Sequence, residues 1–249
     1  MARKAKSRPS ADDRAEAQSQ DKSHERLAAS VSNHHPAQIS LLEATELVEH
    51  GISSSSSSEM IVLAADIRKS TFLMKEAANF VTYAKITGDF VEAAAKLIRD
   101  HGGWFDKFTG DGFLGYWITE RGKWSEPLNK VLPLCQALLH MFQEVTLPAF
   151  RRNSKNFPKG VGLSLGLDAG ETHFAMIANE LTIVGPSVVG AVRMVSCANP
   201  WEAVANVYLG ETLYENRGQF VEHDLEVRRE FRATKEYEEQ EVYPMTFKR

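Results

Sequence analysis

The stretch Trp104–Trp117, WFDKFTGDGFLGYW, decides the fold of this chain. Two apolar runs rich in aromatic residues flank the turn Thr109–Gly112, which is the pattern of a β-hairpin. Asp111 lies in this turn with glycine on both sides, and a second aspartate, Asp66, ends another apolar run. If the two strands are neighbours, both carboxylates lie at the same edge of the sheet.

Asp66 ends the run Met60–Ile67, MIVLAADI, which is apolar and partly β-branched. Such a run favours a buried central strand over an edge strand. The segment that follows opens a helix, and the free backbone N–H groups of a helix start are suited to bind a triphosphate. We therefore expect Lys69, Ser70 and Thr71 to contact the phosphates of a substrate.

Each aspartate has a structural explanation when it is taken alone. Aspartate is common in glycine-rich turns, as at position 111, and it is a common helix cap, as at position 66. Two carboxylates on rigid strand ends, with Lys107 close to one of them, instead favour a site for divalent metal ions and substrate phosphates.

Strand and helix signals alternate from residue 59 onward. We expect helices over about 80–101, 127–150 and 187–197, strands over 161–169 and 171–175 with a turn at Gly170, and further strands around one short helix from 205 to 247. The order βαββαβ followed by extra strands predicts an α+β sandwich, with helices on one face of a mostly antiparallel sheet.

The composition favours one sizeable domain with a polar tail, because the 249 residues are 43% hydrophobic and 25% charged. Residues 1–36 are predicted to be disordered, and 37–58 to form a short helix and a serine-rich linker. The net charge is -4 and the basic residues are scattered, which speaks against nucleic acid as a partner. No apolar run is long enough to span a bilayer, so we expect a cytoplasmic protein with no membrane partner.

Four segments resemble the catalytic domain of class III adenylyl and guanylyl cyclases. Lys107–Trp117 is similar to the Lys-x-x-Gly-Asp-Gly-Phe hairpin of that family, and the other three are Val62–Thr71, Leu165–Glu171 and Gly185–Arg193. The resemblance implies a ferredoxin-like cyclase domain over residues 59–249. It also implies a head-to-tail homodimer whose active sites are shared between two copies.

The resemblance implies a role for each matching residue. Asp66 and Asp111, with the backbone carbonyl of Ile67, would hold two Mn²⁺ or Mg²⁺ ions. Arg193 of one copy would stabilise the transition state in the site of the other.

Two further residues have roles that follow from the same resemblance. Lys107 takes the position of the residue that contacts the base of the substrate. Lys235 corresponds to a lysine that binds the triphosphate.

Two positions depart from the adenylyl cyclase pattern. Thr182 stands in place of the aspartate that reads the base, and Val189 stands in place of the asparagine that positions the ribose. Ala64, on the same strand face as Asp66, either lines the nucleotide pocket or packs within the sheet.

These departures leave three interpretations open: a pyrimidine cyclase, an adenylyl cyclase making cAMP, and a non-catalytic nucleotide-binding sensory domain. The chain resembles the Pycsar pyrimidine cyclases of bacterial anti-phage systems. The resemblance implies UTP or CTP as substrate, with UTP favoured, and cUMP or cCMP as a messenger that switches on an effector.

Overall fold

Strand β1 (Ser57–Arg68) lies at the centre of the sheet, between β3 and β4. The strands pair in the order β2-β3-β1-β4-β6-β9-β7, with β5 added to β4 and β8 to β9. Every pairing is antiparallel except that of β4 with β6. The other strands are β2 Trp104–Phe108, β3 Gly112–Thr119, β4 Gly162–Ile177, β5 Glu180–Val184, β6 Ala203–Ala205, β7 Leu225–Val227, β8 Glu230–Arg232 and β9 Gln240–Phe247.

The computed structural model describes residues 57–178, 180–219, 225–234 and 239–247. The predicted tail over 1–36, the predicted helix near residue 42 and Lys235 lie outside these described residues. Within them, no helix combines the length and the apolar character needed to cross a membrane.

The helices follow the predicted periodicity. The helix predicted over 80–101 is α4, and the one predicted over 127–150 is α5 and α6 joined by a π-helical turn, η1. The helical elements are α3 Ser70–Glu76, α4 Phe80–Asp100, α5 Ser125–Met141, η1 Phe142–Thr146, α6 Leu147–Arg152, α7 Pro186–Cys197, α8 Val207–Glu215 and η2 Arg217–Gln219.

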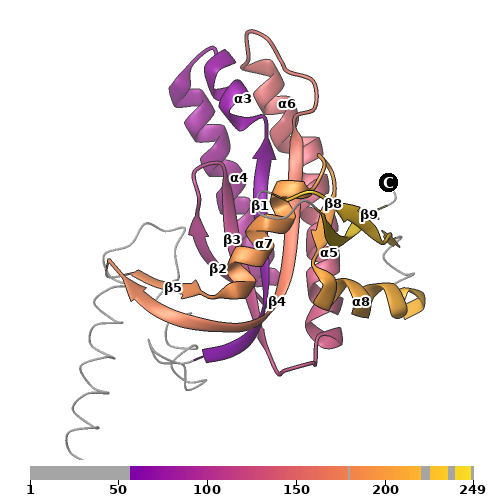
Figure 1. Ribbon diagram of the computed structural model, residues 1–249. Coiled ribbons are helices and arrows are strands. Elements are labelled where there is room, and N and C mark those ends of the chain that lie inside the picture. Colours follow the sequence, from indigo (N-terminus) through magenta and orange to yellow (C-terminus); the bar gives the residue numbers. More distant parts are fainter. Residues whose placement is uncertain (1–56, 179, 220–224, 235–238, 248–249) are drawn as a thin grey trace, which may run out of the picture.

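Helices cover both faces of the sheet, which corrects the expectation of one covered face. Ile61 and Leu63 of β1 pack in the cluster that holds α4 and α5, whereas Val62 and Ala64 pack beneath α7. In Figure 1, α7 crosses in front of the sheet and α4 and α5 lie behind it. The reason is the unbroken apolar run of β1, because a strand that is apolar on both faces needs cover on both.

Three local predictions were wrong. The chain does not turn at Gly170: β4 continues through it, pairing Gly170 with Met60, and ends at Ile177. Strand β1 begins at Ser57, inside the predicted linker. The strand predicted from residue 205 ends there, because the side chain of Asn206 accepts a hydrogen bond from Leu209 N–H and caps α8.

The buried centre of β1 sets an expectation for stability. Leu63 is fully buried between β3 and β4, so Leu63→Ala should lower the free energy of unfolding by about 3 kcal/mol. Val81→Ala, at a side chain that is 74% exposed, should change it by less than about 0.5 kcal/mol. Urea unfolding measures both, and equal effects would contradict the central position of β1.

Candidate active site

The sheet brings Asp66 and Asp111 to the same edge, as predicted from their positions near the end of one strand and in the turn of the hairpin. Asp66 pairs with Gly112 across β1 and β3, and Ile67 N–H donates to the backbone carbonyl of Asp111 at 3.2 Å. N–H and C=O of one strand residue point to the same side, so the carbonyl of Ile67 also faces this turn. Two carboxylates and a carbonyl therefore belong to one edge of the sheet.

Glycine at two positions makes this approach possible. A Cβ at Gly112 would lie 1.8 Å from the backbone oxygen of Ala65, closer than any real contact. Gly110 has a φ of 101°, which side chains other than glycine rarely adopt. The glycines on either side of Asp111 thus let the hairpin turn fit against the end of β1.

The two carboxylates affect each other electrostatically. Burial raises the pKa of Asp66, and the negative charge of Asp111 raises it further. The Arg68 guanidinium, 3.4 Å from Asp66, opposes this rise. Ser70 Oγ donates to the carboxylate of Asp111 at 2.5 Å and holds it in place.

The oxygen donors at this edge fit a hard divalent cation such as Mg²⁺ or Mn²⁺. A cation would also relieve the repulsion that raises the pKa of Asp66. The part of the chain that the structure describes contains no cluster of three or more His, Cys, Asp or Glu side chains. Mg²⁺ usually takes its remaining ligands from water and from substrate phosphates.

A cavity of about 780 Å³ opens beside Asp111, within the size range of small-molecule sites. Ser70, Thr71 and Lys107 line it together with Asp111, and apolar side chains of α4 form much of the rest. Ala64 is 3% exposed and packs beneath α7, so it belongs to the core and does not line this cavity.

Lys69, which was predicted to contact phosphate with Ser70 and Thr71, lies outside the lining of this cavity. It is exposed and adopts a φ of 66° as the N-cap of α3. Ser70 and Thr71, which do line it, are the residues of this segment that the structure places beside Asp111.

Lys107 and Thr182, both predicted to recognise the base, are in direct contact. Lys107 Nζ donates to Thr182 Oγ1 at 2.6 Å. Asp106 is 4% exposed beneath them, and its carboxylate accepts hydrogen bonds from Thr182 Oγ1 and from Ile183 N–H, each at 3.0 Å. Burial raises the pKa of Asp106, and the Lys107 ammonium and these hydrogen bonds oppose the rise.

Sequence reasoning missed Asp106. Successive residues of a strand point to opposite faces, so Asp106 and Lys107 are not expected to reach one side chain. The β2–β3 pairing shifts register between Phe105 and Lys107, and such a bulge redirects side chains. An acidic residue directly before Lys107 was the only signal in the sequence.

Helix α7 carries Val189 and Arg193. The Val189 side chain is 49% exposed. Arg193 lies near Asp168 of β4, where burial raises the pKa of the carboxyl and the positive charge of Arg193 opposes that rise. Gly190 allows α7 to approach, because a Cβ there would lie 1.6 Å from a carboxylate oxygen of Asp168. Asn206, the N-cap of α8, donates a hydrogen bond to the same carboxylate.

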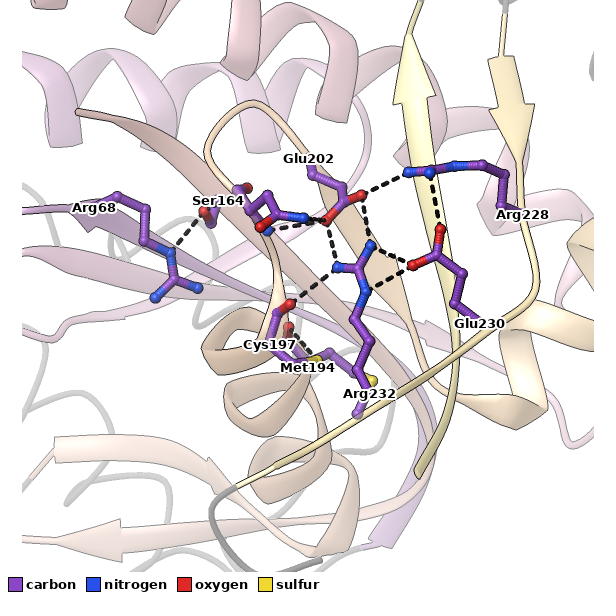
Figure 2. A network of polar contacts seen from close by, with 9 residues as sticks. Arg68, Ser164, Met194, Cys197, Glu202, Arg228, Glu230 and Arg232 are labelled. Carbon is purple, nitrogen blue, oxygen red and sulfur yellow. Dashed lines mark hydrogen bonds and ion pairs between the residues drawn. The ribbon is translucent and has the colours of Figure 1, made fainter. Parts of the chain in front are cut away.

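A network of charged side chains fastens the C-terminal strands to the end of α7 (Figure 2). Glu202, almost fully buried, accepts from Arg232 at 2.6 Å and from Arg228 at 2.9 Å. Arg232 also contacts Glu230 and donates to the backbone carbonyl of Cys197. Burial opposes ionisation of Glu202. The hydrogen bonds from Arg232 and from Asn199 N–H, together with the charges of Arg232 and Arg228, nevertheless hold the pKa of Glu202 below its ordinary value.

The same network reaches the strand of the first aspartate. Arg68 Nε donates to Ser164 Oγ, which donates to the carbonyl of Asn199, each at 2.8 Å. Asn199 N–H in turn donates to Glu202 at 2.9 Å. Figure 2 shows this row of contacts running from Arg68 toward the arginines that bind Glu202. The end of β1 is therefore braced against the C-terminal part of the fold.

Asp168 sets an expectation for pH dependence. Burial raises its pKa to about 7, so the fold favours the protonated form. Its contribution to stability is fully present below pH 4 and is lost as pH rises through about 7. Asp168→Asn keeps the oxygen that accepts from Asn206 and Ala169, and should remove this loss.

Urea unfolding of both proteins at pH 5 and pH 8 measures this effect. The free energy of unfolding of the variant, relative to that of the unsubstituted protein, should be higher at pH 8 than at pH 5. The same difference at pH 5 and pH 8 would show that Asp168 does not titrate in this range.

Comparison with known proteins places the fold. No protein-family model matches the chain, and neither does any curated protein sequence. Solved structures do match, and the three described here each cover 78% of this chain. The adenylyl cyclase CyaB from P. aeruginosa matches over 97% of its own chain with a TM-score of 0.63 and 19% identity, and the guanylyl cyclase Cya2 over 95% with 0.62 and 17%.

A third match is the catalytic core of a rhodopsin-guanylyl cyclase with converted specificity, in complex with ATPαS. It matches over 99% of its own chain, with a TM-score of 0.58 and 14% identity. At these identities the likeness concerns the fold. The described residues therefore have the fold of the class III adenylyl and guanylyl cyclase catalytic domain.

Proposed function

We propose that this chain is a nucleotide cyclase that converts UTP, or CTP, to the 3′,5′-cyclic nucleotide and pyrophosphate. The observation that carries the proposal is the approach of two carboxylates: Asp66 pairs with Gly112 and so lies beside Asp111, and Asp111 lines a cavity together with Ser70, Thr71 and Lys107. The cavity supplies room for a nucleotide, and the carboxylates supply oxygen ligands at its edge.

The residues have separable tasks in this reaction. Two bound divalent ions would lower the pKa of the ribose 3′-hydroxyl and bind the triphosphate oxygens. Asp66 and Asp111 would hold these ions, and the hydrogen bond from Ser70 keeps Asp111 oriented. Ser70 and Thr71 would bind phosphate oxygens, and Lys107 with Thr182 would contact the base. Most of the catalysis is then positioning and charge stabilisation.

A second copy of the chain completes the site in this proposal. Arg193 of the partner would neutralise charge on the α-phosphate as pyrophosphate leaves. Val189 and Val192 lie on α7 near Arg193, and both side chains are 49% exposed. Apolar side chains grouped on a surface suit a subunit interface, which supports α7 as part of the contact. We assign the ribose-facing position to Val189 and a triphosphate-binding role to Lys235.

The choice of base rests on side chains rather than on the fold. Solved neighbours include adenylyl and guanylyl cyclases, and one guanylyl cyclase core with converted specificity binds ATPαS. Thr182 and Val189 replace residues of the adenylyl cyclase pattern, which supports a base other than adenine. An adenylyl cyclase is the second candidate, because Lys107, the residue at the base-contacting position of that pattern, is retained and contacts Thr182. The test below therefore includes ATP.

The product would act as a second messenger. The sequence resemblance to pyrimidine cyclases of anti-phage systems supports a role in antiviral defence, in which the cyclic nucleotide switches on a separate effector. A non-catalytic sensory domain is the third candidate, and it predicts binding of a triphosphate without release of pyrophosphate.

The direct test is to incubate the purified protein with Mn²⁺ and each of ATP, GTP, CTP and UTP, and to identify the products by mass. We expect cUMP as the main product, or cCMP. A product from ATP alone would reject the pyrimidine assignment. Triphosphate binding without pyrophosphate release from any of the four would reject the catalytic proposal.

Asp66→Asn and Asp111→Asn test the metal site. Each should lower turnover by more than about 100-fold, because losing a ligand costs more than the roughly 10–100-fold typical of its outer partners. Thermal unfolding should show that both variants stay folded. Lys85→Gln, which removes an exposed ion pair with Asp89 on α4, is the matched control and should retain activity.

Mixing two inactive variants tests the shared site. Asp66→Asn and Arg193→Ala each disable both sites of their own dimer, but a mixed dimer contains one whole site. Random exchange of subunits should restore roughly one quarter of the activity of the unsubstituted protein, since half of the dimers are mixed. Absence of rescue in dimers shown by mass to be mixed would mean that Arg193 acts within its own chain.

A further inference from the structure

The carboxylate of Asp106 is surrounded by groups that donate hydrogen bonds. Ile183 N–H donates to it at 3.0 Å, the hydroxyl of Thr182 lies 3.0 Å from both of its oxygens, and the Lys107 ammonium is 3.5 Å away. Ile183 N–H and the ammonium can only donate. This environment suits the ionised form of Asp106, which can only accept.

An ionised Asp106 determines where the hydroxyl hydrogen of Thr182 points. Thr182 Oγ1 has one hydrogen and two lone pairs. The hydrogen must go to Asp106, and one lone pair accepts from Lys107 at 2.6 Å. One lone pair is left, and the Lys107 ammonium keeps further N–H groups. Lys107 lines the cavity, and Thr182, 7% exposed, lies against it outside the lining. A base that reaches past Lys107 would meet one acceptor beside one donor.

We propose that Asp106 is a positioning residue for base selection, which holds Thr182 as an acceptor beside the donor Lys107. This inference rests on the proposed function, in which these two residues contact the base. A pair made of one donor and one acceptor matches the uracil edge, where the O4 carbonyl lies next to N3–H, and also the cytosine edge, where N3 lies next to the amino group. O4 accepts from Lys107, and N3–H donates to Thr182.

Asp106→Asn alters the hydrogen-bond pattern with little change in shape. The amide oxygen takes the hydrogen bond from Ile183 N–H, and the amide NH₂ then faces Thr182 and donates to its oxygen. That bond uses the lone pair that was free. The donor Lys107 remains, but the acceptor for the base is lost.

The two pyrimidines respond differently to this loss. N3–H of uracil is left without an acceptor, whereas cytosine can turn its two adjacent acceptors, N3 and O2, toward Lys107. Leaving one donor unpaired costs roughly 1.4 kcal/mol, equal to about tenfold in affinity. The preference for CTP over UTP should therefore rise about tenfold in Asp106→Asn.

The experiment measures dissociation constants for the uncleavable α,β-methylene analogues of UTP and CTP with Mg²⁺, together with turnover of the natural nucleotides. The proteins are the unsubstituted chain, Asp106→Asn, Thr182→Val and the double variant. The ratio of the two constants cancels any general loss of affinity, because both analogues carry the same triphosphate. Thr182→Ser, which keeps the hydroxyl, is the matched control and should keep the original ratio.

We expect Asp106→Asn and Thr182→Val each to shift the ratio toward CTP about tenfold. Asp106→Asn should add nothing in the Thr182→Val background, because the hydroxyl it acts on is gone. An unchanged ratio in Asp106→Asn, or the same shift with and without the Thr182 hydroxyl, would overturn the proposal. If Asp106→Asn does not fold, Thr182→Val still tests the proposal. An unchanged ratio of the two dissociation constants in Thr182→Val would by itself overturn it.

Failure of the proposed activity is distinguishable from failure of this inference. If the unsubstituted protein binds the analogues but cyclises no nucleotide, the catalytic proposal fails and the binding ratios still decide the role of Asp106. If it binds neither analogue, both proposals fail.

Discussion

The close approach of β1 and β3 at Gly112 is the constraint on which the site depends. Only a residue without a Cβ fits against the backbone of Ala65, and this fit pairs Gly112 with Asp66 and brings Asp111 to the end of β1. The repulsion between the two carboxylates is a cost that packing on both faces of β1 must offset. The buried strand thus supplies the rigidity that the acidic edge requires.

Partly or fully buried acidic groups recur in this fold, and each is compensated differently. Glu202 is ion-paired with two arginines and braces the C-terminal strands. Asp106 has one ammonium and a set of hydrogen bonds. Asp168 has Asn206 and the charge of Arg193, and its pKa rises to about 7. The degree of compensation separates Glu202, whose pKa is held below its ordinary value, from Asp168, which titrates near neutral pH.

Much of the architecture was predictable from the sequence because it follows local pattern. The hairpin at residues 104–117, the long helix α4 and the central position of β1 each follow from apolar periodicity and turn residues. The turn predicted at Gly170 failed because pairing with Met60 keeps β4 extended. A glycine is compatible with a turn and with a strand, and only the neighbouring strand decides between them.

The sequence by itself determined which residue types end the strands, and therefore that Asp66 and Asp111 are candidates for one metal site. Tertiary structure alone decided the rest of the site. Ala64 lies in the core beneath α7, and Lys107 donates a hydrogen bond to Thr182, 75 positions later in the chain. The tertiary structure also places Asp106 under that pair through a bulge in β2. Long-range pairing and a shift in register have no local signature, because they depend on which backbone lies alongside.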